Sequence, residues 1–193
     1  TLRKVSAAEQ KAMIEKINQT ATTIHSLECG FTQVKTLRFL DEQLTSQGRM
    51  WFKGDGGKLR WEYLSPYTYT FIINNQKVYI SSAKSRQTID IRQSRLFQGI
   101  AEVMMNSVTG KSLSSDTDFT CTMYVDGEEW VAALVPQKKE LKKMFKDIRL
   151  HFSKSKQMVT KVEMTEPGGD TTVITLKDQK TNGKIDEKIF AAQ

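Results

Sequence analysis

The most constraining feature of this sequence is a change in the spacing of its apolar residues near position 27. Before it, apolar residues of the stretch 13–24 recur every three or four positions, the period of an amphipathic helix. After it, apolar residues alternate with polar neighbours, as at Leu59, Trp61 and Tyr63. A period of two is typical of half-buried antiparallel strands. The chain is therefore expected to place one helix ahead of a fold built mainly of strands.

The first half of the chain contains start and stop signals that agree with this pattern. Ser6 and Glu9 form a capping box, which predicts a helix over about 6–25. Gly54–Gly57 and Asn74–Asn75 supply turns, and asparagine tolerates the positive φ of a tight hairpin. The alternating runs between these signals centre on residues 27–31, 50–52, 59–63, 69–73 and 78–80.

The second half adds one more helical segment and further strands. Residues 94–108 have a helical stripe closed by Gly110, and 136–147 fit a short basic turn of helix. Strands are expected at 119–125, 130–135, 148–152, 159–164 and 171–176. The order predicts one long antiparallel sheet curled on itself, with helices over its open side. A chain of 193 residues is expected to form this fold as a single domain over 1–193.

The net charge is +7, with an isoelectric point near 9.3, so the surface should attract nucleic acid, anionic lipid or an acidic protein. The lysines cluster between Lys138 and Lys146, where Phe145 is the only aromatic residue. Stacking on bases needs interleaved aromatic residues, so a solvated face is favoured over nucleic-acid recognition. No apolar run approaches the roughly 18 residues of a membrane-spanning helix.

The sequence contains no recognisable catalytic arrangement. His25 and His151 lack a carboxylate, cysteine or second histidine at metal or triad spacing. The carboxylate pairs Asp116/Asp118 and Glu128/Glu129 lie beside predicted turns and are interpreted as solvated surface. Phosphate-binding loops and nucleophile motifs are missing as well. We therefore expect a protein that is not an enzyme and needs no cofactor or metal.

Two further residue types leave alternatives open. Cys29 and Cys121 each lie in an alternating apolar stretch, so buried thiols are favoured over a disulfide between them. Eight methionines and nine phenylalanines are spread through the chain. Methionine is flexible and adapts to irregular shapes, so this inventory fits either an ordinary core or the lining of a cavity.

Residues 27–80 resemble the LolA family of periplasmic carriers of outer-membrane lipoproteins. The resemblance rests on "FTQ" at 31–33, "GRMWF" at 48–52, "LRWEY" at 59–63 followed by Pro66, and "KVYI" at 77–80. Near the end of the chain, "DTTVITL" and "NGKIDEKIF" are similar to the last strand and tail of that family. The order and spacing of these motifs frame almost the whole chain.

The resemblance implies a mainly β fold with a helical lid. It implies an open, strongly curved antiparallel half-barrel of about 11 strands, with an N-terminal and an inserted helix over its concave face. Leu59 and Trp61 match the paired apolar residues that point into an acyl-chain cavity, and 96–105 falls where a lid helix belongs. Together with the alternation, this gives an expected set of cavity residues: Phe31, Met50, Phe52, Leu59, Trp61, Tyr63, Phe71, Ile73, Leu96, Phe97, Ile100 and Met104.

The resemblance also implies a location and partners. It implies a periplasmic monomer whose signal peptide has been removed, which takes acylated lipoproteins from an inner-membrane ABC-type release complex to an outer-membrane acceptor, without nucleic acid. Related carriers have a basic residue and a proline in the turn before the Leu59 strand, which hold the lid shut. Here that turn is Gly54–Gly57. A LolA-fold module for another lipid or a regulatory partner is the alternative function.

Overall fold

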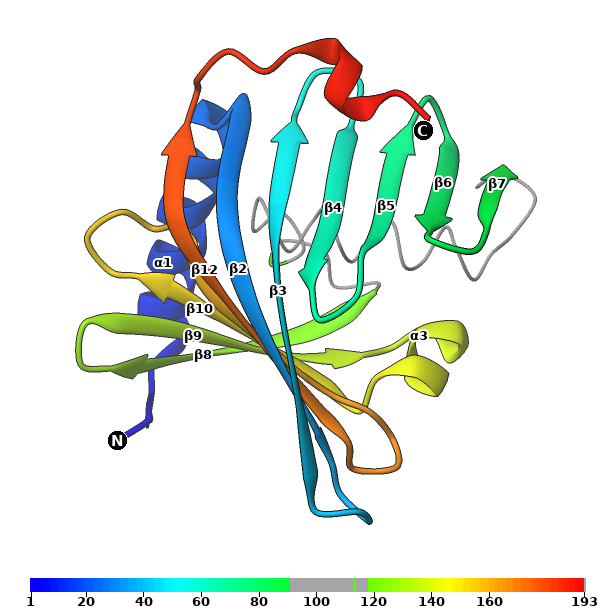
Figure 1. Cartoon of the computed structure of the whole chain (residues 1–193). Coiled ribbons are helices and arrows are strands. Elements are labelled where there is room, and N and C mark those ends of the chain that lie inside the picture. Colours follow the sequence, from blue (N-terminus) through cyan, green and yellow to red (C-terminus); the bar gives the residue numbers. More distant parts are fainter. Residues whose placement is uncertain (91–112, 114–117, 193) are drawn as a thin grey trace. The chain divides into compact units, whose positions relative to one another are not determined.

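The computed structural model, drawn in Figure 1, describes residues 1–90, 113 and 118–192. The chain forms two compact units, and their segments interleave along the sequence. Unit 1 comprises Thr1–Thr23, Val34–Leu44 and Asn106–Thr175. Unit 2 comprises Ile24–Gln33, Thr45–Met105 and Leu176–Gln193. The single domain expected over 1–193 stays a prediction.

The strands form one antiparallel sheet of twelve strands in the order β1-β8-β9-β10-β11-β12-β2-β3-β4-β5-β6-β7. Strands β1 and β7 lie at the two ends of this order, so the sheet is open, and the expected mainly β fold class is confirmed. Its strands are β1 (Arg3–Lys4), β2 (Ser26–Leu37), β3 (Glu42–Lys53), β4 (Lys58–Ser65), β5 (Tyr69–Asn74), β6 (Lys77–Ser82), β7 (Arg86–Asp90), β8 (Phe119–Asp126), β9 (Glu129–Pro136), β10 (Asp147–Ser153), β11 (Val159–Thr165) and β12 (Thr171–Thr181).

Unit 1 begins with the predicted N-terminal helix, α1 (Ala7–Thr23). The Ser6 hydroxyl accepts a hydrogen bond from the Glu9 backbone N–H at 3.1 Å, which confirms the capping box. The apolar face of α1 is buried, and the Gln10 side chain bonds the backbone of β8 on that side. Its amide donates to the Cys121 carbonyl and accepts from the Met123 N–H, both at 3.0 Å.

Unit 1 also contains the meander β8 to β11, in which α3 lies between β9 and β10. A turn at Asp126–Gly127 joins β8 to β9, with Gly127 at a φ of 60°. The short basic helix expected in 136–147 is α3 (Lys139–Met144), whose Leu141 is buried. The alternating residues of β9 and β10 form the core of this unit, with Leu134, Ile148 and Leu150 at most 1% exposed.

Unit 2 contains the four-strand meander β4 to β7 and the β3 segment that pairs with β4. The β5–β6 turn is centred on Asn75 and Gln76, with φ of 51° and 62°, one residue beyond the predicted Asn74–Asn75. Two consecutive positive φ values define a type I′ hairpin, whose twist matches that of the strands. Strand β7 was not predicted, because its exposed, mostly polar residues lack the alternation that marks the other strands.

The C-terminal segment of unit 2, residues 182–192, packs on one face of β3 to β6. It ends in a short 3₁₀ helix, η3 (Glu187–Phe190), capped by the Asp186 carboxylate. Ile72, Ile185 and Phe190 form a buried apolar cluster, with Trp51 and Tyr79 packed against it. The predicted helix at 94–108 lies outside the described residues. Neither α1 nor α3 is long and apolar enough to cross a membrane.

Candidate functional site

The register of β3, β4 and β5 gathers apolar side chains on one face of the sheet. Met50 pairs with Trp61, Phe52 with Leu59, and Leu59 in turn with Ile73. Directly paired residues of antiparallel strands point to the same face, and each strand alternates between faces. We call this surface the apolar wall, formed by the residues Phe31, Met50, Phe52, Leu59, Trp61, Tyr63, Phe71 and Ile73.

Aromatic rings form the centre of the wall. The Phe31 ring of β2 stacks on Trp61 of β4, with ring centroids 4.2 Å apart and an interplanar angle of 24°. The Tyr63 ring meets Phe31 edge-on at 5.3 Å, and the Tyr69 ring lies 6.1 Å from Tyr63. Stacked and edge-on geometries are the favoured arrangements of aromatic pairs. The aromatic rings thus continue from fully buried Phe31 to partly exposed Tyr69 at the start of β5.

Gly48 makes this aromatic packing possible. A Cβ atom at position 48 would lie 2.5 Å from the edge of the Phe31 ring and 2.0 Å from the Glu62 carbonyl oxygen. The pairing of β3 with β4 shifts register at this point, between Gln47 and Gly48. Glycine in a strand interior often marks a bulge or a close approach, and here it marks both. The first residue of the "GRMWF" motif is therefore glycine because any side chain there would collide with its neighbours.

Two titratable groups on this side of the sheet, Cys29 and Tyr63, are neutral at pH 7. Burial raises the pKa of the Cys29 thiol from 9.0 to about 12 and outweighs the nearby Arg49 guanidinium. Burial also raises the pKa of the Tyr63 hydroxyl, which donates a hydrogen bond to the Gln33 side-chain oxygen at 2.8 Å. An apolar ligand on the wall would therefore not strip water from a charged Cys29 or Tyr63.

The opposite face of the same strands has a different chemistry. Arg60 lies there, as its alternation with Leu59 and Trp61 predicts, and it is 6% exposed. Its guanidinium forms an ion pair with Glu62 and donates to the Ile189 carbonyl at 3.1 Å. The guanidinium carbons of Arg49 and Arg60 lie 5.3 and 5.6 Å from the centroid of the Trp51 ring. This face combines apolar packing with directed polar bonds.

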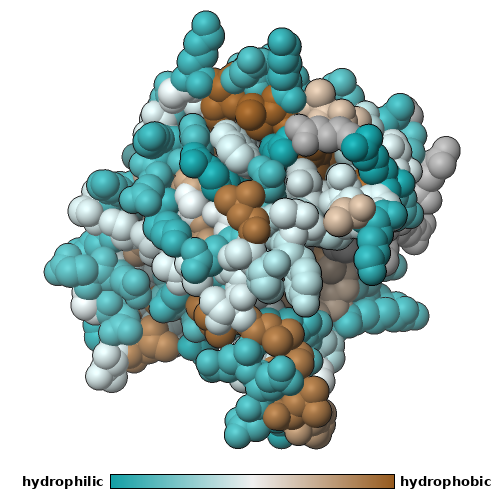
Figure 2. Space-filling model, in the orientation of Figure 1, coloured by the Kyte–Doolittle hydropathy of each residue, from teal (hydrophilic) through white to brown (hydrophobic). Residues whose placement is uncertain are grey.

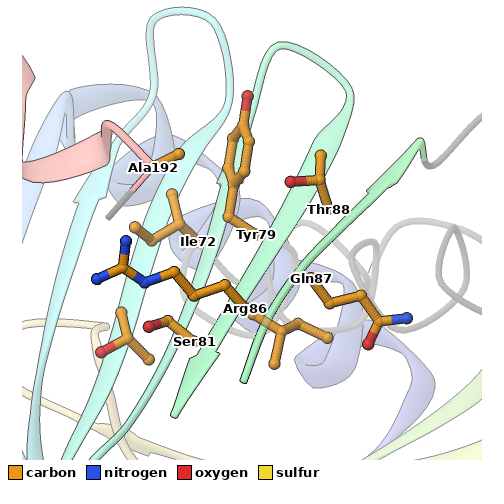
Figure 3. Close-up of a pocket in the computed structure, with 9 residues that line it drawn as sticks. Ile72, Tyr79, Ser81, Arg86, Gln87, Thr88 and Ala192 are labelled. Carbon is orange, nitrogen blue, oxygen red and sulfur yellow. The ribbon is translucent and has the colours of Figure 1, made fainter. Parts of the chain in front are cut away.

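Two pockets open on this opposite face, beside the C-terminal segment. One has a volume of about 300 Å³ and is lined by four charged residues, one indole and one aliphatic residue: Arg60, Glu62, Asp186, Lys188, Trp51 and Ile189. The other has a volume of about 90 Å³ and lies over β5, β6 and β7 next to Ala192 (Figure 3). Arg86, Ser81 and Thr88 give it polar groups. None of the residues that form the wall lines either pocket.

Residues 22–193 match the family model described as outer membrane lipoprotein carrier protein LolA. The chain belongs to the LolA family. A comparison with curated proteins finds no match. Membership of this family agrees with the order of motifs from "FTQ" to "NGKIDEKIF" along the chain.

Solved structures similar to this LolA-family chain share its fold at low sequence identity. A chain of the MucA/MucB complex of Pseudomonas aeruginosa has a TM-score of 0.57 and 12% identity, over 96% of this chain and 61% of that chain. The lipoprotein LppX of Mycobacterium tuberculosis has a TM-score of 0.54 and 9% identity, over 94% and 100%. A putative outer membrane lipoprotein-sorting protein domain from Vibrio parahaemolyticus has a TM-score of 0.50 and 12% identity, over 96% and 97%. This chain thus spans less than two thirds of the MucA/MucB chain that it matches.

The turn expected to hold the lid of a LolA-family carrier is here a glycine turn. Gly56 and Gly57 have φ of 76° and 59°, a conformation that favours glycine. The next basic residue, Lys58, forms an ion pair with Glu187 of the C-terminal segment at 2.6 Å. Lys53 pairs with the same carboxylate, and the two lysines lower its pKa to about 2. These charges link the C-terminal segment to the two ends of the β3–β4 turn.

The structure brings the predicted site residues of β2 to β5 together on one wall. All of them are buried except Tyr63, which is partly exposed. Leu96, Phe97, Ile100 and Met104 lie outside the described residues, and their place in the site stays a prediction. The expectation of a buried thiol is confirmed for Cys29, whereas Cys121 is half-buried, and neither forms a disulfide.

One polar cluster in unit 1 was missed by the sequence analysis. The two ring nitrogens of His151 lie 3.2 Å from the Glu129 carboxylate and 2.7 Å from the Glu163 carboxylate. The three side chains come from β9, β10 and β11, so sequence spacing gives no signal and only the strand register joins them. The cluster links three strands of the unit. Within the described part of the chain, no group of three or more histidine, cysteine or acidic residues could hold a metal ion.

Proposed function

We propose that this LolA-family protein is a periplasmic carrier that binds the acyl chains of lipoproteins on its apolar wall. In this role it takes lipoproteins from an inner-membrane ABC-type release complex and delivers them to an acceptor in the outer membrane. The observation that supports the proposal is the one-sided wall, where aromatic and aliphatic side chains of four neighbouring strands share one face. No covalent chemistry, metal or cofactor is needed for this role.

The energetics of lipid transfer explain why such a carrier needs an apolar surface. Each acyl methylene moved from a bilayer into water costs about 0.8 kcal/mol, so three chains of roughly fifteen methylenes would cost on the order of 36 kcal/mol. Transfer through water without a carrier is therefore too slow to be useful. The apolar wall would replace the lost bilayer contacts, and an energy-using release complex would supply the remaining free energy.

The composition of the wall suits temporary binding. Aromatic faces and the flexible Met50 side chain make contacts that do not depend on one ligand shape. Directed hydrogen bonds would instead select a single ligand and slow its release. A carrier that must accept cargo and hand it over is better served by the first kind of contact. The wall contains one hydrogen-bonded hydroxyl, that of Tyr63, at its partly exposed end.

Two tryptophans on neighbouring strands provide a matched test. Trp61 lies on the wall, whereas Trp51 lies on the opposite face and pairs with Arg60. A fatty acid brominated along its chain quenches indole fluorescence on contact. We expect a stoichiometric amount of this probe to quench Trp61 in a Trp51→Phe variant, and to leave Trp51 unquenched in a Trp61→Phe variant. Both variants carry Trp130→Phe, so that one indole remains in each.

The same probe measures affinity. Trp61→Glu places a charge on the wall and is expected to weaken binding of the fatty acid at least roughly tenfold. Trp51→Glu on the opposite face is the matched control and should retain affinity if it folds. Circular dichroism checks that each variant is folded. Equal quenching of both indoles, or equal loss of affinity in both glutamate variants, would contradict the proposal.

A second candidate is a LolA-fold module that binds another lipid or regulates a protein partner. The likeness to a chain of the two-protein MucA/MucB complex supports this alternative. Native mass spectrometry of protein extracted gently from its own cell envelope separates the candidates. Bound diacylated or triacylated lipoproteins support the carrier, whereas a phospholipid or a single signalling protein supports the module.

A further inference from the structure

The turn between β2 and β3 exposes three large apolar side chains. Phe39 is 85% exposed, Leu40 is 68% exposed and Leu44 is 46% exposed, all within six consecutive positions of unit 1. Figure 2 shows brown, apolar atoms at the bottom of the view, where Figure 1 draws the β2–β3 turn. Single exposed apolar residues are normal on protein surfaces, but a group of large ones marks an interaction site. We call these three residues the apolar tip.

The tip is held in place by the neighbouring β11–β12 turn. The Arg38 N–H donates to the Asp170 carboxylate at 3.0 Å, and the Lys35 ammonium lies 3.7 Å from the Glu166 carboxylate. Gly169, with a φ of 96°, packs so closely on the Arg38 side chain that a Cβ there would lie 2.6 Å from the arginine Cδ. These contacts fix the base of the turn while Phe39 and Leu40 point away from it. The exposure is therefore built into the hairpin.

We propose that the apolar tip inserts into the interfacial region of a phospholipid bilayer. A specific protein interface usually buries about 800 Å² on each partner, which is more than the end of one hairpin offers. A narrow turn with a phenylalanine and leucines is instead the right size to enter the boundary between lipid headgroups and acyl chains. The two strands pair with each other up to the turn, so few unpaired backbone groups accompany the side chains.

The charges of the tip indicate which force governs this contact. Lys35 and Arg38 are balanced by Asp41 and Glu42, so the stretch 35–44 has no net charge. The Arg38 guanidinium lies 5.7 Å from the centroid of the Phe39 ring, where it would meet lipid phosphates as the ring enters the bilayer. Insertion should therefore depend on apolar contact and persist at high salt. The net charge of +7 on the whole chain would add a separate, salt-sensitive attraction to anionic lipid.

This inference does not rest on the proposed carrier function. The tip belongs to unit 1, whereas the described wall belongs to unit 2, and bilayer contact needs no bound acyl chain. A protein that failed to bind fatty acid could still insert its tip. A fatty-acid carrier could likewise fail to bind vesicles.

The test is flotation of the full chain, free of lipoprotein, with vesicles of pure phosphatidylcholine in about 0.5 M salt, which screens charge attraction. We expect the wild-type chain to float with the vesicles. Replacing both Phe39 and Leu40 with serine should lower the vesicle-bound fraction by at least roughly tenfold, because the partition depends on the apolar area buried. Circular dichroism confirms the fold of the variant, since both side chains are exposed.

A matched control exists at the β4–β5 turn of unit 2. Leu64 and Tyr67 are 50% and 81% exposed there, so replacing both with serine removes a similar apolar area from another turn. This control is expected to float like the wild-type chain. The proposal is overturned if the wild-type chain stays unbound, or if the tip and control variants lose binding equally. It is also overturned if the tip variant loses binding only to native envelope vesicles that contain protein, because the partner is then a protein.

Discussion

The two faces of β3 to β6 differ in how they are closed, although both have apolar side chains at their centre. On the face opposite the wall, which we call the outer face, the C-terminal segment is fixed by directed bonds. The Asn74 amide donates to the Phe190 carbonyl at 3.0 Å, and the Arg60 guanidinium donates to the Ile189 carbonyl. On the apolar wall, ring stacking of Phe31 on Trp61 has no such direction. The first face is therefore closed by contacts that fix direction, whereas the ring contacts of the second depend on shape alone.

This difference shows how one set of strands can present two chemically different faces. Alternating side chains let each strand contribute to both faces independently. Trp51 and Trp61 are the clearest pair, because two indoles on neighbouring strands lie on opposite faces and contact guanidinium groups in one case and an aromatic ring in the other. The protein can therefore change the wall without rebuilding the face that the chain closes for itself.

The largest expected effect concerns chemical reactivity on the wall side, at Cys29. Its pKa of about 12, against an ordinary 9.0, leaves roughly a thousandfold less thiolate, and the thiolate is the reactive form. In a Cys121→Ser variant, Cys29 should react with a disulfide reagent only after urea unfolds the protein. Cys121 in a Cys29→Ser variant should react much faster in the folded state. Equal rates would mean that the wall side is open to water.

The pKa of Cys29 also predicts a change of stability with alkaline pH. Because folding raises this pKa, the neutral thiol stabilises the folded state fully below pH 9.0, and the contribution is lost as the pH rises toward about 12. The free energy of unfolding should fall over this window in the Cys121→Ser variant. It should fall less in the Cys29→Ser variant, which has no thiol at the buried position.

The largest expected loss of stability lies on the outer face, at Phe190. This side chain is fully buried against Ile72 and Ile185, so Phe190→Ala should lower the free energy of unfolding by about 3–5 kcal/mol. Urea denaturation measures the change, and Phe190→Leu is the control that keeps most of the volume. Where the variant is folded, the fatty-acid probe should still bind. A loss of binding as large as the loss of stability would mean that the two faces are not independent.

A smaller loss is expected at Gly48, where the wall presses on the backbone. The methyl group of Gly48→Ala would overlap the Phe31 ring and the Glu62 carbonyl, and overpacking of this kind costs about 1–3 kcal/mol. The matched control is Gly183→Ala in the same unit, because nothing lies within 4 Å of a Cβ there. Denaturation curves compare the two variants. A neutral Gly48→Ala would show that the aromatic packing yields easily.

The smallest effect is expected from Glu187, whose charge is exposed on the outer-face segment. Lys53 and Lys58 lower its pKa from 4.5 to about 2, so its contribution to stability is present above pH 4.5 and is lost as the pH falls toward 2. Glu187→Gln should flatten the pH dependence of the urea midpoint in that window. Because the group is exposed, added salt should reduce the difference between the two proteins. A difference that survives 1 M salt would contradict a surface ion pair.

The alternation of residues predicted the two faces of β4 correctly, because a period of two fixes the face of every side chain once the strand exists. Alternation places Leu59, Trp61 and Tyr63 on one face of the strand and Arg60 and Glu62 on the other, and the strand pairing confirms this. The same rule predicted Met50 and Phe52 on β3. The local sequence pattern was therefore enough to predict the face of each side chain in strands where burial alternates strictly.

The contacts that depend on distant parts of the chain were not predictable. The buried Arg60 was expected on an outer face, but nothing near it in the sequence indicates the covering residues Ile189 and Phe190. His151 has no carboxylate at a suitable spacing in the sequence, because its carboxylate partners come from two other strands. The apolar tip was missed as well, since a sequence cannot show that Phe39 stays exposed at the end of a hairpin. In each case the strand register or tertiary burial decides, and neither is encoded locally.

The packing of the C-terminal segment also sets the order in which unit 2 is completed. Asn74 and its partner Phe190 are separated by 116 residues, so the outer face of β5 is synthesised long before the residues that cover it. During that interval Ile72 and Trp51 have no permanent cover, and such exposed apolar strands are prone to aggregate. A binding factor that holds the growing chain would therefore protect this protein most while the tail is still missing.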